Sequence, residues 1–203
     1  MRKNEIDSRE VHQPSRYSHT VLKTKRYTQM IEWYNTVLGA RTVFSSERIS
    51  LITFDEEHHR LGFMNVDDLI DKPKFSTGLH HTSYTYDDLG ELFATYRRLA
   101  TSEILPRWCI NHGLTMSFYY ADPDGNFVEL QFENFGNVED SMEYMQESEE
   151  FRENPNGCLF DPETLIERFE SGESVEKLVL RQYRDNDPSP LELLAEMGLY
   201  NPK

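Results

Sequence analysis

Apolar residues in the first two thirds of the chain follow two periods, one typical of strands and the other of helices. Residues 16–24 form a short strand-like run. In residues 25–38 the apolar positions recur every three or four residues, as on one face of an amphipathic helix, and Gly39 is placed to end that helix. Three further strand-like runs follow, at 40–48, 49–57 and 58–66. This order predicts a βαβββ unit over about residues 15–70.

The same order of elements then repeats. A strand is predicted at 78–87 and an amphipathic helix at 88–103, and three more strands follow at 105–113, 114–124 and 126–135. A His-Thr pair occurs early in the first strand of each unit, at His19-Thr20 and His81-Thr82. We therefore predict an α+β fold with a second βαβββ unit at about 78–135. Two such units can pair their sheets into a cup-shaped barrel that is lined by the inward residues of each strand.

The two ends of the chain lack this pattern. Residues 1–14 are polar and predict a loose N-terminal arm, which leaves residues 15–135 as the barrel domain. Residues 136–203 predict a helical C-terminal extension, with helices that begin at Asp161-Pro162, Ser174 and Ser189-Pro190. Their apolar stripes indicate packing against either the barrel or a neighbouring subunit, so a homo-oligomer is one of two expectations.

Charge and composition exclude several classes of partner. The 203 residues carry a formal net charge of -15, and the segment after Gly136 supplies most of it, with 17 acidic and 6 basic residues. Binding to nucleic acid or to an anionic membrane needs clustered Lys and Arg, so neither is expected. No apolar run is long enough for a membrane span or a signal peptide. With only Cys109 and Cys158, we expect free thiols and a cytoplasmic location.

Residues 110–129 combine a predicted hairpin with groups that can bind protons or metal. The tetrapeptide 122–125, Asp-Pro-Asp-Gly, has the residues that a tight turn requires. The flanking strands carry His112, Tyr119 and Glu129. A single such residue in a strand is most often a solvated side chain, so the prediction of a site depends on partners from elsewhere in the chain.

Histidines near the start of each unit are the expected partners. His19 and His81 occupy corresponding first strands, which meet at the centre of a paired barrel, and Glu129 lies on the last strand. Two imidazoles and one carboxylate form the ligand set of non-heme Fe(II) oxygenases and leave adjacent coordination positions open. Zn²⁺ can use the same ligands for hydrolysis, so these residues alone leave the metal undetermined.

The sequence resembles the type I extradiol ring-cleavage dioxygenases of the vicinal oxygen chelate superfamily. The family signature is a His, a short run, an aliphatic residue or Phe before Tyr, an acid-Pro-x-Gly turn and a Glu. Here it reads His112, Phe118-Tyr119, the 122–125 turn and Glu129. The resemblance covers about residues 15–135 and implies a glyoxalase-like barrel. It also implies that the enzyme cleaves a catechol-type substrate with O₂.

The resemblance also implies a role for each site residue. His19, His81 and Glu129 correspond to the Fe(II) ligands of the family, with Mn(II) as the alternative metal. His59 corresponds to the acid–base group, a role that suits imidazole because its ordinary pKa lies near neutrality. His112 and Tyr119 correspond to residues that hydrogen-bond the substrate oxygens and orient the metal ligands.

Three of these residues have an adjacent rival of the same type: His80 beside His81, His58 beside His59, and Tyr120 beside Tyr119. Adjacent residues on a strand point to opposite faces, so only one of each pair can face the site. The His-Thr repeat favours His81 and leaves His80 on the surface or between sheets. Tyr120 is expected to face the core. Trp108, Phe118 and Tyr84 line either an aromatic substrate pocket or the core.

Two other functions are compatible with the same fold. One is a different metal-dependent vicinal oxygen chelate enzyme, such as an isomerase, epimerase or glutathione-dependent lyase. Those enzymes usually take a carboxylate or Gln ligand from the first unit, where this chain offers His59. The other is a ligand-binding protein of the bleomycin-sequestering type, which has no use for three metal-binding residues.

Overall fold

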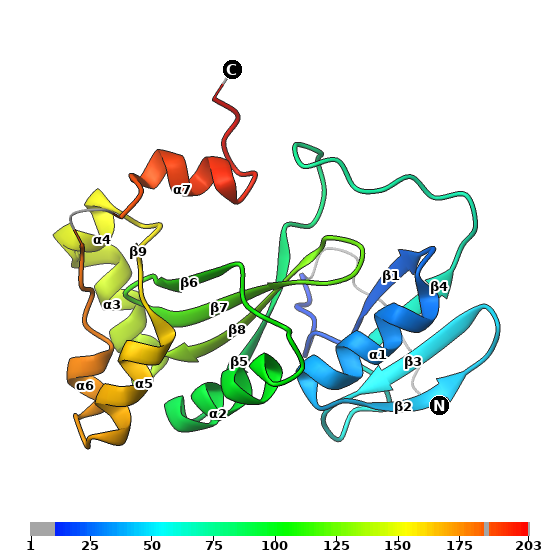
Figure 1. The fold of residues 1–203 in the computed structure, drawn as a ribbon, viewed down its shortest axis with the longest axis horizontal. Helices are drawn as coiled ribbons and strands as arrows, with labels where there is room; N and C mark the ends of the chain where they lie inside the picture. The colour runs from blue at the N-terminus through cyan, green and yellow to red at the C-terminus, as the bar shows by residue number, and fades with distance from the viewer. Residues whose placement is uncertain (1–10, 185–186, 203) are drawn as a thin grey trace, which may run out of the picture.

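The computed structural model describes residues 11–184 and 187–202 and contains the two predicted βαβββ units (Figure 1). Residues 1–10 of the predicted arm lie outside this range, and residues 11–14 form neither helix nor strand. The first unit comprises β1 (Thr20–Thr24), α1 (Tyr27–Leu38), β2 (Arg41–Ser45), β3 (Ile49–Thr53) and β4 (Leu61–Asn65). The second comprises β5 (His81–Tyr86), α2 (Leu89–Ala100), β6 (Trp108–Asn111), β7 (Thr115–Ala121) and β8 (Phe127–Glu133). The predicted α+β repeat is confirmed.

Each unit forms its own sheet. The first sheet has the strand order β1-β4-β3-β2, and the second has the order β5-β8-β7-β6-β9. In both sheets the first strand of the unit runs parallel to the last strand, while the other pairs are antiparallel. The two units are therefore topological copies of one another. His19 directly precedes β1, and His81 is the first residue of β5.

The two units share one hydrophobic core. The helices α1 and α2 each cover one face of their own sheet and contact each other (Figure 1). Met30, Tyr34 and Val37 of α1 are at most 1% exposed and join the same buried cluster as the α2 residues Leu92 and Leu99. Burial of this amphipathic face of each helix thus also fixes one unit against the other.

The C-terminal extension is mostly helical, as predicted, but it also contributes a strand. Its elements are α3 (Val138–Glu147), α4 (Glu149–Glu153), β9 (Cys158–Leu159), α5 (Pro162–Glu170), α6 (Val175–Leu178) and α7 (Pro190–Glu196). The expectation of helices and loops alone was wrong at β9, which pairs with β6 and widens the second sheet. Two residues of strand have too little periodicity to be recognised in a sequence. The extension packs on the second unit, which is one of the two expected arrangements.

The tight turn of residues 122–125 forms as predicted. The Gly125 amide donates to the Asp122 carbonyl at 2.9 Å, and Gly125 has the positive φ of 81° that favours glycine. The Asp122 side chain accepts from the backbone amides of Asp124 and Asn126 at 2.9 and 2.8 Å. This turn connects β7 to β8 and sets the register that pairs Tyr119 with Glu129.

The structure bears on the expected free thiols and on the possibility of membrane-spanning helices. Cys109 and Cys158 are both buried free thiols, which confirms that they form no disulfide. Within residues 11–184 and 187–202, no helix is both long enough and apolar enough to cross a membrane.

Candidate active site

The second sheet presents the predicted site residues on one of its faces. Its register pairs Tyr119 with Glu129 across β7 and β8, and His81 with Phe127 across β5 and β8. Residues two positions apart on a strand share a face, so His81, Tyr119 and Glu129 lie on the same side of the sheet. The alternate residues of these strands face the opposite way, into the main core beneath α2.

A chain of hydrogen bonds runs across this face. The Tyr119 hydroxyl donates to Glu129 Oε1 at 2.7 Å, and His112 Nε2 lies 3.0 Å from the same hydroxyl. On the other side of the carboxylate, His81 Nε2 lies 3.3 Å from Glu129 Oε2. Glu129 and Tyr119 are only 5% and 3% exposed. The structure thus brings together four of the six predicted site residues, with Glu129 at their centre.

The electrostatic surroundings keep the Glu129 carboxylate ionised. Burial alone would raise its pKa, but hydrogen bonds from His81, Ser117 and Tyr119 favour the charged form and lower the pKa to about 2. Burial and the Glu129 charge raise the pKa of Tyr119 above its ordinary value. At neutral pH the pair is therefore a carboxylate and a protonated phenol, so Tyr119 remains a hydrogen-bond donor.

The extension holds His112 in place from behind. Arg181 donates to the His112 carbonyl. Burial lowers the pKa of His112, which favours the neutral imidazole. Because the Tyr119 hydroxyl gives its only proton to Glu129, His112 Nε2 is placed to donate to that hydroxyl.

The first unit supplies a second group of site residues. The rings of His19 and His59 lie 4.4 Å apart between centroids. Arg60 fixes this approach, because its carbonyl accepts from the Thr20 amide at 3.0 Å and its guanidinium donates to the Ser18 carbonyl at 3.1 Å. Burial, together with the neighbouring His19 and His58 rings, lowers the pKa of His59 and favours its neutral form.

A cavity of about 490 Å³ is lined by residues of both units, although none of the six predicted site residues is among them. Tyr17 and Thr20, on either side of His19, contribute to its lining, and so do Thr82 and Ser83, which follow His81. The segments that carry these two histidines therefore border the same space. However, within residues 11–184 and 187–202, no three His, Cys, Asp or Glu side chains lie close enough together to hold a metal ion. His81 and Glu129 are brought together, and the inclusion of His19 with them stays a prediction.

The three rivals occupy different surroundings from their neighbours. Tyr120 is 1% exposed and belongs to the main core, as expected. The His58 side chain is 69% exposed, and its Nδ1 lies 2.5 Å from His59 Nδ1. His80 is half-buried rather than on the surface, because its Nε2 lies 3.1 Å from the Met197 carbonyl. Of the three aromatic residues, Trp108 and Tyr84 line cavities, while Phe118 is fully buried in the core.

Residues of the last helix also reach this face, although the sequence suggested no site in the extension. Leu193 and Met197 are 2% and 6% exposed and pack in one cluster with Tyr119 and Ile110. The apolar stripe of residues 190–197 was the available signal, but it does not say which surface the helix covers. Ser117, which hydrogen-bonds Glu129, was also missed, since a strand serine has no distinctive pattern.

Comparison with known proteins places this geometry in a family. The family model described as "Glyoxalase/Bleomycin resistance protein/Dioxygenase superfamily" matches residues 16–130. Biphenyl-2,3-diol 1,2-dioxygenase 2 of Rhodococcus globerulus is 40% identical over 164 residues, which cover 80% of this chain and 86% of that protein. Biphenyl-2,3-diol 1,2-dioxygenase 3 of the same organism is 38% identical over 170 residues, or 83% and 89% of the two chains.

A solved structure supports the fold independently. A putative glyoxalase from Bacillus halodurans superimposes with a TM-score of 0.51 at 15% sequence identity, and the match covers 58% of this chain and 96% of that chain. At this identity the likeness concerns the fold alone. It agrees with the match to the family description.

Proposed function

The chain belongs to the glyoxalase/bleomycin resistance protein/dioxygenase superfamily and to its extradiol ring-cleaving dioxygenase type, and on that basis we propose that it opens a catechol-type ring at a mononuclear Fe(II) site. The observation that carries the proposal is the contact of His81 with Glu129, which is in turn hydrogen-bonded by Tyr119. It places a carboxylate, an imidazole and a phenol on one buried face. The isomerase and ligand-binding alternatives have no comparable support.

The donor set fits Fe(II). We assign His19, His81 and Glu129 as the ligands, because two imidazoles and a carboxylate suit this metal and leave positions open for substrate and O₂. The low pKa of Glu129 supplies the deprotonated oxygen that a ligand must offer. Fe(II) held by these residues would supply the redox chemistry with O₂ that ring cleavage of a diol requires.

The other residues of the site transfer protons or orient the metal ligands. His59 is the proposed acid–base group, because its lowered pKa leaves the imidazole neutral at pH 7 and able to accept a proton from a substrate hydroxyl. Tyr119 holds the Glu129 carboxylate in position and remains protonated. His112 fixes the Tyr119 hydroxyl from the other side at 3.0 Å. Such partners of metal ligands set ligand orientation.

The proposal is tested by loading the purified protein with Fe(II) without oxygen and then adding O₂ and a panel of catechols. We expect O₂ uptake and a ring-opened product that carries both atoms of isotopically labelled O₂, as detected by mass spectrometry. Glu129→Gln is expected to lose both iron binding and O₂ uptake. Glu133→Gln, the same change farther along β8, is the matched control and should retain both. Stoichiometric iron with no O₂ uptake across the panel would overturn the proposal.

A further inference from the structure

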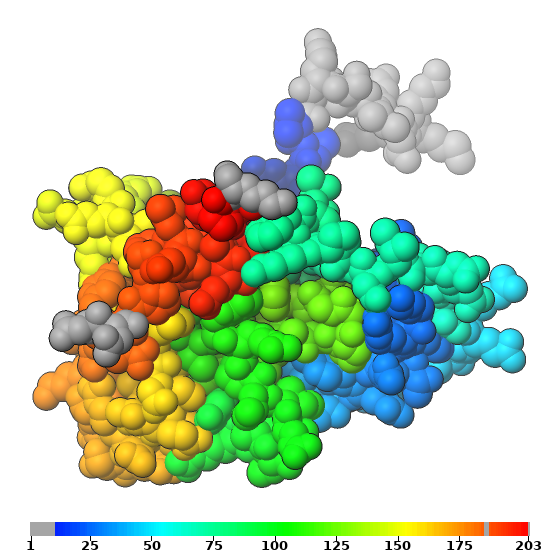
Figure 2. All heavy atoms as spheres, turned by 45° about the horizontal axis from the view of Figure 1, so that its top comes forward, coloured from blue at the N-terminus to red at the C-terminus, as the bar shows by residue number. Residues whose placement is uncertain are grey.

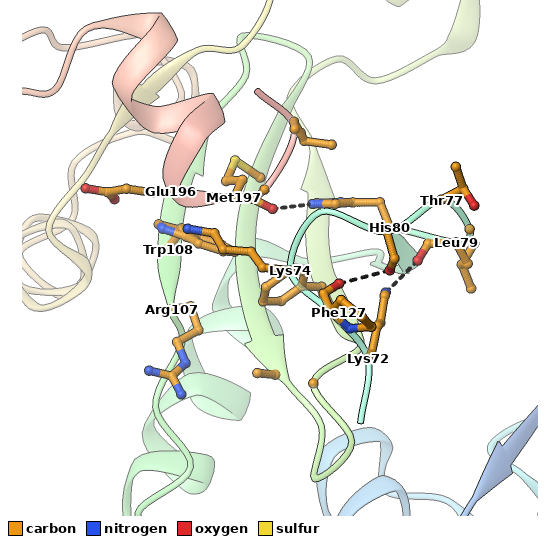
Figure 3. A pocket seen from close by; sticks show the side chains of 17 residues that line it. Lys72, Lys74, Thr77, Leu79, His80, Arg107, Trp108, Phe127, Glu196 and Met197 are labelled. Carbon is orange, nitrogen blue, oxygen red and sulfur yellow. Dashed lines mark hydrogen bonds between the residues drawn. The ribbon is translucent and has the colours of Figure 1, made fainter. Parts of the chain in front are cut away.

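A second cavity, of about 510 Å³, opens beside the candidate site (Figure 3). Trp108 and Phe127 form part of its wall on the sheet face that also carries Tyr119 and Glu129. The remaining walls come from the segment 72–80, which precedes β5, and from residues 196–199 at the end of α7. The cavity thus lies on the catalytic face. The two segments that wall it contain no predicted site residue, although His80, the rival of His81, belongs to the first.

The cavity adjoins the site directly. The Trp108 ring lies 4.8 Å from the Phe127 ring and 6.3 Å from the Tyr119 ring, measured between centroids. Phe127 is the register partner of His81. The His81 and Tyr119 rings touch edge to face, with centroids 5.5 Å apart. A catechol ring bound over these two side chains would therefore have its substituent next to Trp108 and Phe127. These two aromatic side chains can pack against the apolar part of that substituent.

The two outer walls are fastened to each other. His80 Nε2 in the first wall lies 3.1 Å from the Met197 carbonyl in the second. Within the segment 72–80, Lys72 Nζ also donates to the Leu79 carbonyl at 2.8 Å. Gly198 approaches the Lys74 carbonyl so closely that a Cβ there would lie 3.0 Å from it. The segment 72–80 and the end of α7 lie side by side (Figure 2). They form one continuous wall over the cavity.

The charge of this cavity is opposite to that of the protein. Lys72, Lys74 and Arg107 line it together with a single acid, Glu196, although the whole chain carries a net charge of -15. Lys72 is engaged with a backbone carbonyl. Neither Lys74 nor Arg107 forms an ion pair with any described residue, and Lys74 approaches only the Phe75 ring, at 5.5 Å from its centroid. Two cations without counterions beside an aromatic wall suit an anionic ligand group.

We propose that this cavity binds an anionic, carboxylate-type substituent of the catechol ring, with Lys74 and Arg107 as its charge partners and Trp108 and Phe127 against its apolar portion. The proposal rests on the proposed ring-cleavage function and narrows its substrate to catechols with a negatively charged side chain. The two cations are positioning residues for the substrate. They take no part in the chemical step.

The test compares two substrates that differ in one charge: 3-(2,3-dihydroxyphenyl)propanoate and its uncharged carboxamide. For the Fe(II)-loaded enzyme we expect kcat/KM to be about tenfold higher for the carboxylate, as two partly exposed ion pairs would provide. The double variant Lys74→Met/Arg107→Met should reduce this preference to about twofold or less, through a lower kcat/KM for the carboxylate. Lys177→Met, which removes an exposed cation on α6, should leave the preference unchanged.

A binding measurement separates this proposal from the ring-cleavage function itself. Metal-free protein is titrated with 3-phenylpropanoate and 3-phenylpropanamide, neither of which can be cleaved, and ligand signals are followed by saturation-transfer NMR. We expect the carboxylate to bind more tightly and to lose that advantage in the double variant. Cleavage without charge preference, or a preference that survives the double substitution, would overturn the subsite alone. Absence of cleavage with intact charge-dependent binding would overturn the ring-cleavage proposal and leave an anion-binding cavity.

Discussion

The Tyr34 hydroxyl donates a 3.0 Å hydrogen bond to the buried carboxylate of Asp122, and this bond joins the first βαβββ unit to the turn between β7 and β8 of the second. Next to it, Arg26 at the start of α1 pairs with Asp124 at 2.7 Å. The turn therefore does more than set the register of the hairpin. It attaches the strands that carry Tyr119 and Glu129 to the unit that carries His19 and His59.

Removing the Tyr34 hydroxyl tests this attachment. Burial raises the pKa of Asp122, which shows that its charge is poorly solvated and depends on the donors that remain. We expect Tyr34→Phe to lower the free energy of unfolding by about 1.5–3 kcal/mol, the usual range for a hydrogen bond to a charged group. Urea denaturation at pH 7 provides the measurement.

Tyr27→Phe is the matched control for this substitution. It lies two turns earlier on α1, and its hydroxyl donates to the Ser46 carbonyl at 2.9 Å in an exposed position. Water can replace that bond, so a much smaller loss of stability is expected. Equal losses in the two variants would mean that the contact between Tyr34 and Asp122 contributes no special stability.

The repeat could be predicted because it rests on local patterns. The helical spacing before Gly39, the strand runs and the 122–125 turn are each encoded within a few neighbouring residues. The bond between Tyr34 and Asp122 spans 88 positions in the sequence, and no local pattern reports such a contact. The short β9 was missed for a related reason, because its strand character arises only from pairing with β6.

The N-cap of α5 provides a pH-dependent test that the extension is folded onto the second unit. Asp161 Oδ1 accepts from the Thr164 amide at 2.8 Å, and this bond holds the pKa of Asp161 below its ordinary 3.8. A carboxylate with a lowered pKa contributes stability above its unfolded pKa and loses it as the pH falls through the folded value. We expect Asp161→Ala to cost about 1 kcal/mol at pH 7.

Wild type and Asp161→Ala should differ less in their free energy of unfolding as the pH is lowered from 6 to 3. Thermal unfolding at each pH provides the measurement. Asp161→Asn keeps a side-chain oxygen that can cap the helix and has no charge to titrate. It should therefore retain most of the stability at pH 7, and its own stability should lack the contribution that titrates below pH 4. If the stability difference between wild type and Asp161→Ala stays constant with pH, the ionised Asp161 carboxylate does not stabilise α5 as its N-cap.

The site was predictable where family resemblance and strand alternation coincide. His81, Tyr119 and Glu129 come from the three strands β5, β7 and β8, and His112 comes from the turn between β6 and β7. The register of the sheet brings the four residues together. His19 and His59 are paired by Arg60, which has no signature of its own in the sequence. The approach of these two groups to one metal depends on how two sheets are placed, which no strand pattern encodes.

Two adjacent tyrosines provide a direct test of face assignment. Tyr119 bonds the ionised Glu129, whereas the buried Tyr120 hydroxyl has no hydrogen-bond partner among the described residues. We expect Tyr119→Phe to lower kcat/KM of ring cleavage by about 10- to 100-fold, with iron content retained, since removal of a hydrogen-bond partner that orients a metal ligand typically costs that much.

The same change at the next position should behave in the opposite way. Tyr120→Phe removes a buried, unsatisfied hydroxyl, so activity should be unchanged and the stability equal or higher. Oxygen uptake with a catechol substrate and metal analysis of both variants provide the measurements. A larger loss of activity in Tyr120→Phe than in Tyr119→Phe would reverse the assignment of the two faces.

Finally, the packing of α7 on the catalytic face can be tested through two leucines of the same helix. Leu193 is 2% exposed and shares a cluster with Tyr119 and Met197, whereas Leu191 is 58% exposed. Leu193→Ala leaves a cavity beneath the helix and is expected to cost about 2 kcal/mol, the lower end for buried leucines because α7 is short and can partly collapse. Because Leu191 is exposed, Leu191→Ala removes little buried surface and should change neither stability nor activity.

The end of α7 also forms a wall of the cavity beside Trp108, so Leu193→Ala should raise KM more than it lowers kcat. Unfolding curves and steady-state kinetics of the two variants decide the matter, and identical behaviour would show that α7 does not support this face.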